Sequence, residues 1–166
     1  KEKLISPEDI RCLHPIFQGK YGDKLIKFGV KLTALDVANA VYDGSKHLSG
    51  HEFCTDLLDK MQVKRIVKNA EILESFKNKP FITVSNHPYG HIDGIALIEI
   101  VASRVDHYKV MVNYILGLID TMSENFIAVS PYKSEQPDSK SLNGIKECIA
   151  HLKKGYPLGF FPSGSN

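Results

Sequence analysis

The stretch that decides the fold is residues 81–94, Phe-Ile-Thr-Val-Ser-Asn-His-Pro-Tyr-Gly-His-Ile-Asp-Gly. Its first residues, Phe81–Ser85, are mostly β-branched or aromatic and follow a proline, which predicts a short buried strand. Pro88 disfavours a helical conformation at the residue before it, and Gly90 allows a sharp turn. The apolar run that follows predicts a buried helix over Ile95–Ala102. We therefore expect a strand, a sharp loop and a helix.

The expected loop carries a histidine, His87, and the expected helix start carries an aspartate, Asp93. One interpretation is structural: the aspartate caps the helix and the histidine satisfies a backbone group at the strand end. The other is chemical, because an imidazole at a strand end with a carboxylate nearby has the parts of a general base and its orienting group. With Asn86, Gly90 and Gly94 around the pair, we expect His87 and Asp93 to be catalytic.

A second histidine in the loop, His91, makes a metal site an alternative. His87, His91 and Asp93 are all possible ligands for zinc or iron, as in metal-dependent hydrolases. Such sites normally use further ligands, and the other candidates, His107 and His151, have no recognisable ligand spacing. We therefore expect no bound metal, and we expect His91 to line a pocket or to face solvent.

Residues 86–94 resemble the first motif of the glycerolipid (lysophospholipid) acyltransferase superfamily, an Asn-His pair followed by a nearby Asp. Five residues separate His87 from Asp93, one more than is usual in that superfamily. This spacing resembles a bacterial branch often labelled hemolysin-like, which includes acyltransferases of ornithine and glycine aminolipids. Asn39, Tyr42 and Phe53 also look like that branch.

A second part of the resemblance lies near the end of the sequence. Residues 161–164, Phe-Pro-Ser-Gly, are similar to the third motif of the superfamily, although Ser165 stands where that motif has Glu. Backbone amides of such a loop would face an anionic head group of the acceptor. Lys133 follows an expected strand where the second motif often has a basic residue, although a solvated loop lysine is an equal alternative. The resemblance implies substrate-binding roles for Asn86, Gly90, Lys133, Pro162, Ser163 and Gly164.

Composition limits the class of protein. The 166 residues suffice for one domain with a real core, and 43% hydrophobic and 24% charged residues are ordinary for a globular protein. The net charge is only +2, and three arginines stand against eighteen lysines, which argues against base-specific DNA binding. Cys12, Cys54 and Cys148 are odd in number and far apart, which indicates structural thiols in a reducing compartment. No signal peptide is visible and no apolar run approaches the ~18 residues of a spanning helix, so we expect membrane contact from one side only.

Two regions are expected along the chain. Residues 1–62 predict an N-terminal helical region that packs on the core, with helices over Thr33–Tyr42 and His51–Met61. Residues 63–166 alternate between short strands and helices, which predicts an α/β core with a mixed, partly parallel sheet flanked by helices. We expect that core to continue beyond Asn166.

Within the α/β core, strands are expected at Val63–Val67, Phe81–Ser85, Tyr108–Val112, Asn125–Val129 and Pro157–Phe161. Shorter helical turns are expected at Glu71–Phe76 and Ile115–Met122. The clearest amphipathic helix is expected at Ser141–Lys154, ending at Gly155. One side of that helix carries Leu142, Ile145, Ile149 and Leu152.

The resemblance and the histidine–aspartate pair together predict an acyltransferase. It would move a fatty acyl chain from an acyl-carrier-protein or coenzyme A thioester to a lysolipid or aminolipid acceptor. His87 would activate the acceptor for direct attack, with no bound cofactor and no nucleic-acid partner. The expected location is cytoplasmic, peripheral on the inner face of the membrane. The alternatives are a metal-dependent hydrolase built on His87, His91 and Asp93, and a non-catalytic, hemolysin-like membrane-binding protein.

Overall fold

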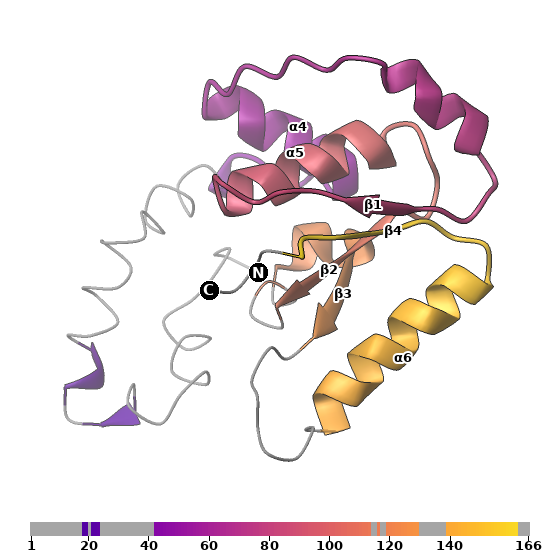
Figure 1. The fold of residues 1–166 in the computed structure, drawn as a ribbon. Helices are drawn as coiled ribbons and strands as arrows, with labels where there is room; N and C mark the ends of the chain where they lie inside the picture. Colours follow the sequence, from indigo (N-terminus) through magenta and orange to yellow (C-terminus); the bar gives the residue numbers. More distant parts are fainter. Residues whose placement is uncertain are drawn as a thin grey trace.

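The structure is a computed structural model that describes residues 18–19, 21–23, 42–113, 116, 119–129 and 139–162. The expected helix over Thr33–Tyr42 and the expected site residue Lys133 therefore lie largely or wholly outside the described residues. The elements in chain order are α4 (Gly50–Lys60), η2 (Ala70–Phe76), β1 (Ile82–Val84), α5 (His91–Ala102), β2 (Lys109–Asn113), η4 (Asp120–Asn125), β3 (Phe126–Val129), α6 (Ser139–Lys153) and β4 (Leu158–Phe160) (Figure 1).

The four described strands form one sheet in the order β1-β4-β2-β3, and every neighbouring pair is parallel. The predicted α/β class is confirmed. The predicted mixed sheet is wrong for the described strands, because β2, β3 and β4 each follow a helical connection that returns the chain to the same end of the sheet.

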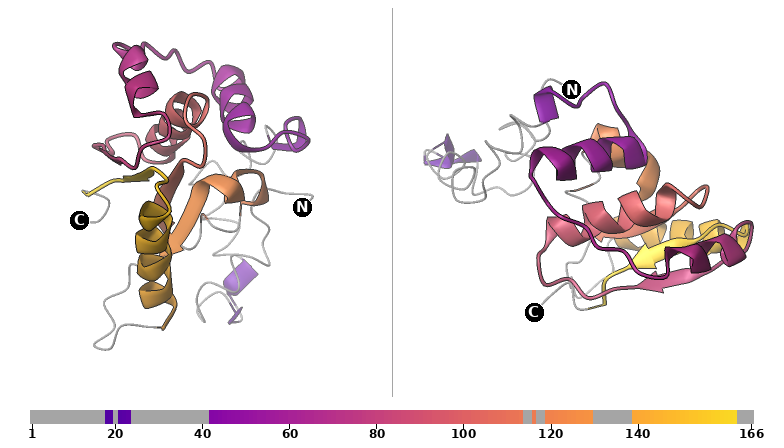
Figure 2. Two further views of the ribbon diagram at one scale, coloured as in Figure 1. Left: turned by 90° about the vertical axis from the view of Figure 1, so that its right-hand side faces the viewer. Right: turned by 90° about the horizontal axis from the view of Figure 1, so that it is seen from above.

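Helices pack on both faces of the sheet, but the prediction that the Phe81–Ser85 strand is buried is wrong for one face of β1, where Ile82 and Val84 are 50% and 61% exposed. Strand side chains alternate between the faces, so Val110 and its partner Phe126 join the core cluster that includes α4 and α5. The next pair, Met111 and Ile127, belongs to the cluster of Cys148 from α6. Figures 1 and 2 show α4 and α5 stacked on one side of the sheet and α6 on the other.

Gly159 in β4, the strand between β1 and β2, leaves room for a side-chain contact between β1 and the residue that precedes β2. Tyr108, which is 1% exposed and precedes β2, shares a hydrogen bond of 2.5 Å between its hydroxyl and that of Thr83 in β1. The bond passes over Gly159, where an added Cβ would lie 2.1 Å from the Tyr108 hydroxyl oxygen. A larger residue would therefore push β1 away from β4, and the loop that follows β1 would lose its position.

The predicted strand over Val63–Val67 is wrong, because these residues have no regular structure. They belong to the connecting segment, residues 61–81, which runs from the end of α4 to β1. Arg65 explains the difference: its guanidinium forms two hydrogen bonds to the carboxylate of Glu99 in α5, at 3.0 and 2.7 Å, and a third of 2.7 Å to Asp59. The segment is thus held against the helices instead of pairing with the sheet.

The predicted helix over Ser141–Lys154 is confirmed as α6, with Gly155 following it at φ +85°. Of the four residues expected on one apolar side, Leu142, Ile145 and Ile149 remain 43–49% exposed, whereas Leu152 packs against the core cluster of Cys148. The side against the sheet carries Gly144 and Cys148, and a Cβ at Gly144 would lie 2.4 Å from the carbonyl oxygen of Ala128 in β3. The close approach of the two backbones determines which side of α6 is buried.

Two of the three predicted structural thiols, Cys54 and Cys148, are buried and form no disulfide. Burial, helped by the charge of Glu99, raises the pKa of Cys54 to about 12, which keeps this thiol protonated and unreactive. Cys12 lies outside the described residues. None of the helices within the described ranges combines the length and the apolar character that crossing a bilayer requires.

Candidate active site

The candidate site lies where two neighbouring strands end. β1 leads into the loop of residues 85–90, and Val84 of β1 pairs with Phe160 of β4. Because the strands are parallel, their carboxyl ends meet at one edge, which is where ligands bind in open α/β sheets. The backbone amide of Ser85 donates to the carbonyl oxygen of Phe160 at 3.3 Å, so the two chain ends remain paired beyond the strands.

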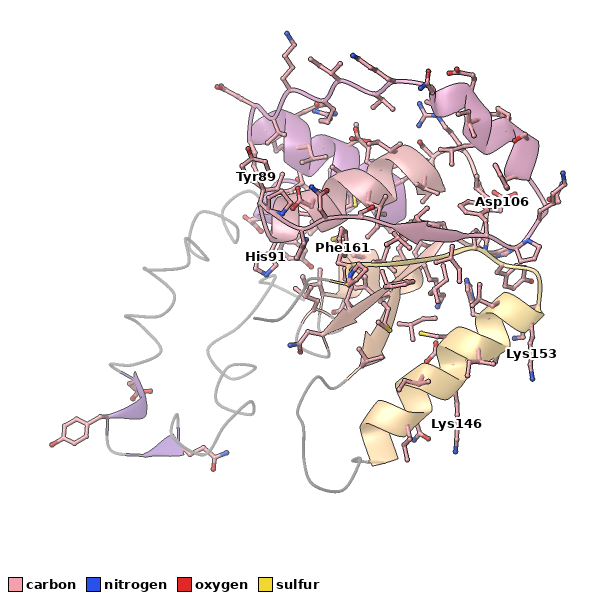
Figure 3. All side chains as sticks on the ribbon, viewed as in Figure 1. Tyr89, His91, Asp106, Lys146, Lys153 and Phe161 are labelled. Atoms are coloured by element: carbon pink, nitrogen blue, oxygen red, sulfur yellow. The ribbon has the colours of Figure 1, made fainter. Side chains whose placement is uncertain are left out.

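The pairing brings two aromatic rings together. Phe161, the first residue after β4, stacks on His87, with ring centroids 4.4 Å apart and planes inclined by 32°. A Cβ on Gly94 in the first turn of α5 would lie 4.0 Å from the Phe161 ring, so that ring fits between the loop and the helix. Figure 3 shows Phe161 beside the start of α5, near Tyr89 and His91.

His87 and Asp93 are brought together, as the sequence predicts. Nδ1 of His87 lies 3.5 Å from Oδ2 of Asp93, and the side chains are 28% and 19% exposed. This distance suits an ion pair when the imidazole is protonated, but it is too long for a hydrogen bond. Nδ1 of His87 is buried and has no hydrogen-bond partner among the described residues. The 28% exposed fraction of the His87 side chain therefore comes from atoms other than Nδ1, a set that includes Nε2.

The carboxylate of Asp93 is fixed by the loop itself. Its Oδ2 accepts a hydrogen bond of 2.8 Å from the backbone amide of Tyr89, and its own amide donates to the carbonyl oxygen of Gly90 at 3.1 Å. Asp93 thus belongs to the first turn of α5 and reaches back over its start, while Gly90 occupies the N-cap position. At φ 62° and ψ −128°, Gly90 has a conformation that other residues avoid, so glycine is needed for the backbone and not for space.

The remaining predicted site residues are only partly placed. Asn86 and Pro162 are exposed on the two chain segments that meet at this edge of the sheet. Lys133, Ser163 and Gly164 lie outside the described residues. The structure therefore brings together His87, Asp93 and Gly90, with Asn86 and Pro162 on the flanking segments.

The histidine of the alternative metal site, His91, begins α5 and is exposed. Among the described residues no three His, Cys, Asp or Glu side chains are grouped closely enough to hold a metal ion. His87, His91 and Asp93 are therefore not arranged as a set of ligands.

The opposite, amino edge of the sheet holds a cavity of about 440 Å³. There His107 stacks on Tyr156 with ring centroids 4.3 Å apart, and His151 from α6 packs against the same tyrosine at 5.2 Å. Nε2 of His151 donates to the carbonyl oxygen of Pro157 at 3.1 Å. Burial lowers the pKa of His151 from its usual value, so the neutral ring is favoured.

Sequence reasoning missed two contacts of the candidate site. Phe161 was identified as part of a motif but not as the ring that supports His87, and the Tyr89 amide was not identified as the donor that fixes Asp93. The first contact depends on β4 lying next to β1, which no local pattern reveals. The second had a signal, since a carboxylate in the first turn of a helix often accepts a hydrogen bond from a backbone amide just before it.

The arrangement brings together an imidazole and a carboxylate, the two groups that a general base and its orienting partner require. A carboxylate held by the backbone faces the inner nitrogen of an imidazole, and 28% of that histidine side chain is exposed at the carboxyl edge of a parallel sheet. No protein-family model, curated protein or solved structure matches this chain.

Proposed function

We propose that this protein is an acyltransferase that moves a fatty acyl chain from an acyl-carrier-protein or coenzyme A thioester to a lysolipid or aminolipid acceptor. The observation that carries the proposal is the inner nitrogen of His87, which is buried, unpartnered among the described residues and 3.5 Å from Asp93. This geometry supports a histidine base. The choice of acyl transfer comes from the resemblance of residues 86–94 and 161–164 to acyltransferase motifs.

In the proposed reaction, Nε2 of His87 takes the proton from the acceptor hydroxyl or amine as that atom attacks the thioester carbonyl carbon. The negative charge of Asp93 stabilises the imidazolium that forms. The new carbon–oxygen or carbon–nitrogen bond forms, the carbon–sulfur bond breaks, and the proton passes from His87 to the leaving thiolate. The amino end of α5 begins beside His87, and a helix N-terminus favours the negative charge that develops on the carbonyl oxygen.

The proposed location is the cytoplasmic side of a membrane, because an acyl carrier protein and coenzyme A are cytoplasmic donors and the acceptor is a lipid. Lys133, Ser163 and Gly164 are proposed to contact the acceptor head group with Asn86, Gly90 and Pro162. This part of the proposal rests on the motif resemblance.

The test is an acyl-transfer assay with the full chain, a long-chain thioester and a lysolipid or a monoacyl aminolipid. Thiol release and the mass of the diacylated product are measured together. We expect His87→Ala to lower turnover by ~10²–10⁴-fold, the usual cost of removing a positioned general base. His91→Ala is the matched control, since this exposed histidine begins the same helix.

Transfer that survives in His87→Ala would contradict the role of His87. Thiol release without an acylated product would show a thioester hydrolase and overturn the proposal. Lipid mass spectrometry of cells with and without the gene would then identify the acceptor, through the diacyl lipid that disappears and the monoacyl precursor that accumulates.

A further inference from the structure

Several large apolar side chains of the connecting segment, residues 61–81, are exposed to solvent. Ile66 is 75% exposed, Ile72 55%, Val67 42% and Phe76 40%. The helical part of the segment, η2, buries none of its residues. Met61, at the start of the segment, is 43% exposed. Single exposed apolar residues are ordinary, but five in one segment indicate a surface that meets an apolar partner.

The segment is anchored firmly to the body of the protein. The guanidinium of Arg65 is bound to Glu99 and Asp59, as described above, and it also donates to the carbonyl oxygen of Val63 at 2.8 Å. Further along, the ring of Phe76 contacts that of Phe81 with centroids 5.5 Å apart, and Phe81 packs against the core cluster. These anchors hold the backbone, so Ile66 and Val67 are presented to solvent and do not fold back onto the core.

Lysines alternate with the apolar residues of the segment. Lys64, Lys68, Lys77 and Lys79 are all exposed, and no described residue forms an ion pair with any of them. The segment also carries Glu71 and Glu74, so the lysines are in excess. Apolar side chains interspersed with lysines are typical of surfaces that lie in the head-group region of an anionic bilayer.

A cavity of about 500 Å³ opens between the segment and α5. Two cations on its lining are available for an anion. Nη1 of Arg104 donates to the carbonyl oxygen of Ile100 at 2.6 Å and to the Ser103 hydroxyl at 3.0 Å, and its other nitrogens have no partner among the described residues. Lys64 lines the same cavity. Guanidinium and ammonium groups are the cations that bind the phosphate of a head group in proteins.

We propose that the connecting segment is the surface by which the protein lies on an anionic lipid bilayer. Ile66, Val67, Ile72 and Phe76 enter the head-group boundary, and the lysines contact anionic head groups. The segment runs over α4 and α5 and begins at the end of the molecule where the His87 loop leads into α5 (Figures 1 and 2). Only the role of this surface rests on the proposed function: it would deliver a lipid acceptor to His87.

The experiment is vesicle flotation of the full chain with phosphatidylcholine vesicles and with vesicles that also contain phosphatidylglycerol. We expect binding to the anionic vesicles, weakened by salt. The double variant Ile66→Ser with Ile72→Ser should bind at least ~10-fold more weakly, because both side chains leave the apolar boundary. Lys64→Gln with Lys68→Gln should lose ~5-fold for each lysine removed.

The helix α6 offers matched controls on the other face of the sheet. Ile145 and Ile149 are 48% and 49% exposed, and Lys146 and Lys153 project from the same helix (Figure 3). Ile145→Ser with Ile149→Ser, and Lys146→Gln with Lys153→Gln, should leave vesicle binding unchanged. An equal loss in the controls, or no binding by the unmodified protein, would overturn the proposed surface.

Two outcomes separate this surface from the proposed reaction. Ile66→Ser with Ile72→Ser should lose transfer to an acceptor embedded in vesicles but keep transfer to the same acceptor dispersed in detergent. Vesicle binding without transfer to either form would contradict the reaction and leave the surface supported. Full transfer by the variant to the embedded acceptor would contradict the surface and leave the reaction supported.

Discussion

At the carboxyl edge of the sheet His87 stacks on Phe161 with ring centroids 4.4 Å apart, and at the amino edge His107 stacks on Tyr156 at 4.3 Å. Both edges therefore hold a histidine supported by an aromatic ring that belongs to a segment flanking β4. The stacking contact alone does not distinguish a reactive histidine from one that contributes only to packing.

The two edges differ in what their buried imidazole nitrogens meet. His151 at the amino edge donates to the carbonyl oxygen of Pro157, which gives its buried nitrogen a structural partner. The buried nitrogen of His87 has no hydrogen-bond partner among the described residues and faces the carboxylate of Asp93. Asn125 on the lining of the amino-edge cavity also has a buried oxygen without a partner among the described residues, so what distinguishes His87 is the carboxylate that its unpartnered nitrogen faces.

Among the substitutions that compare the two edges, the largest expected effect is on turnover. Asp93→Asn should lower turnover by ~10-fold or more, since the charge that stabilises the imidazolium is lost. Its melting temperature should change little, because the Asn side-chain oxygen can still accept from the Tyr89 amide. Steady-state kinetics and thermal unfolding of the same samples measure both effects.

The matched control is Asp106→Asn, which changes an exposed aspartate on the lining of the cavity at the amino edge. It should alter neither turnover nor melting temperature. Normal turnover in Asp93→Asn, with His87→Ala inactive, would show that His87 works without its carboxylate partner.

A smaller effect is expected at the amino edge, and it concerns stability. His151→Ala removes one of the two donors to the carbonyl oxygen of Pro157, which the backbone amide of Lys109 also reaches at 3.3 Å, so the free energy of unfolding should fall by ~0.5–1.5 kcal/mol. Turnover should not change, since His151 lies at the opposite edge from Asp93. Urea unfolding compares this variant with His47→Ala, where an exposed histidine is removed. Loss of turnover at unchanged stability would assign His151 to the chemistry and remove the contrast between the edges.

The order of the strands explains which parts of this contrast the sequence can predict. His87 and Asp93 lie on either side of one short loop, so local patterns suffice to bring them together. The stack of His87 on Phe161 depends on β4 inserting between β1 and β2, and this insertion depends on Gly159 fitting beneath the hydroxyl of Tyr108. Such a fit between residues far apart in the sequence has no local signature.

The errors in the predicted elements have the same origin. Val63–Val67 has the composition of a strand, but the long-range ion pair of Arg65 with Glu99 holds it against α5. In α6, Gly144 allows the helix to approach β3 closely, and three of the four residues on the predicted apolar side, all except Leu152, remain exposed. In both cases a contact with a distant element outweighs the local pattern.

The smallest expected effect is the pH dependence of stability that His151 contributes. Burial lowers the folded-state pKa of His151 below its usual value of 6.5, and the positive charge of Lys109 acts in the same direction. Between the two pKa values the unfolded chain therefore binds more protons than the folded protein, so the free energy of unfolding falls as the pH drops below about 6.5. One group contributes a slope of at most ~1.4 kcal/mol per pH unit within this window and none well above it.

His151→Gln is the informative variant, because its amide can still donate to the carbonyl oxygen of Pro157 but does not titrate. Urea unfolding from pH 7.5 to pH 5 should show a shallower decline for His151→Gln than for the unmodified protein, with the two curves differing least at pH 7.5. Parallel curves over the whole range would mean that His151 titrates alike in the folded and unfolded chains, and its burial at the amino edge would then have no electrostatic consequence.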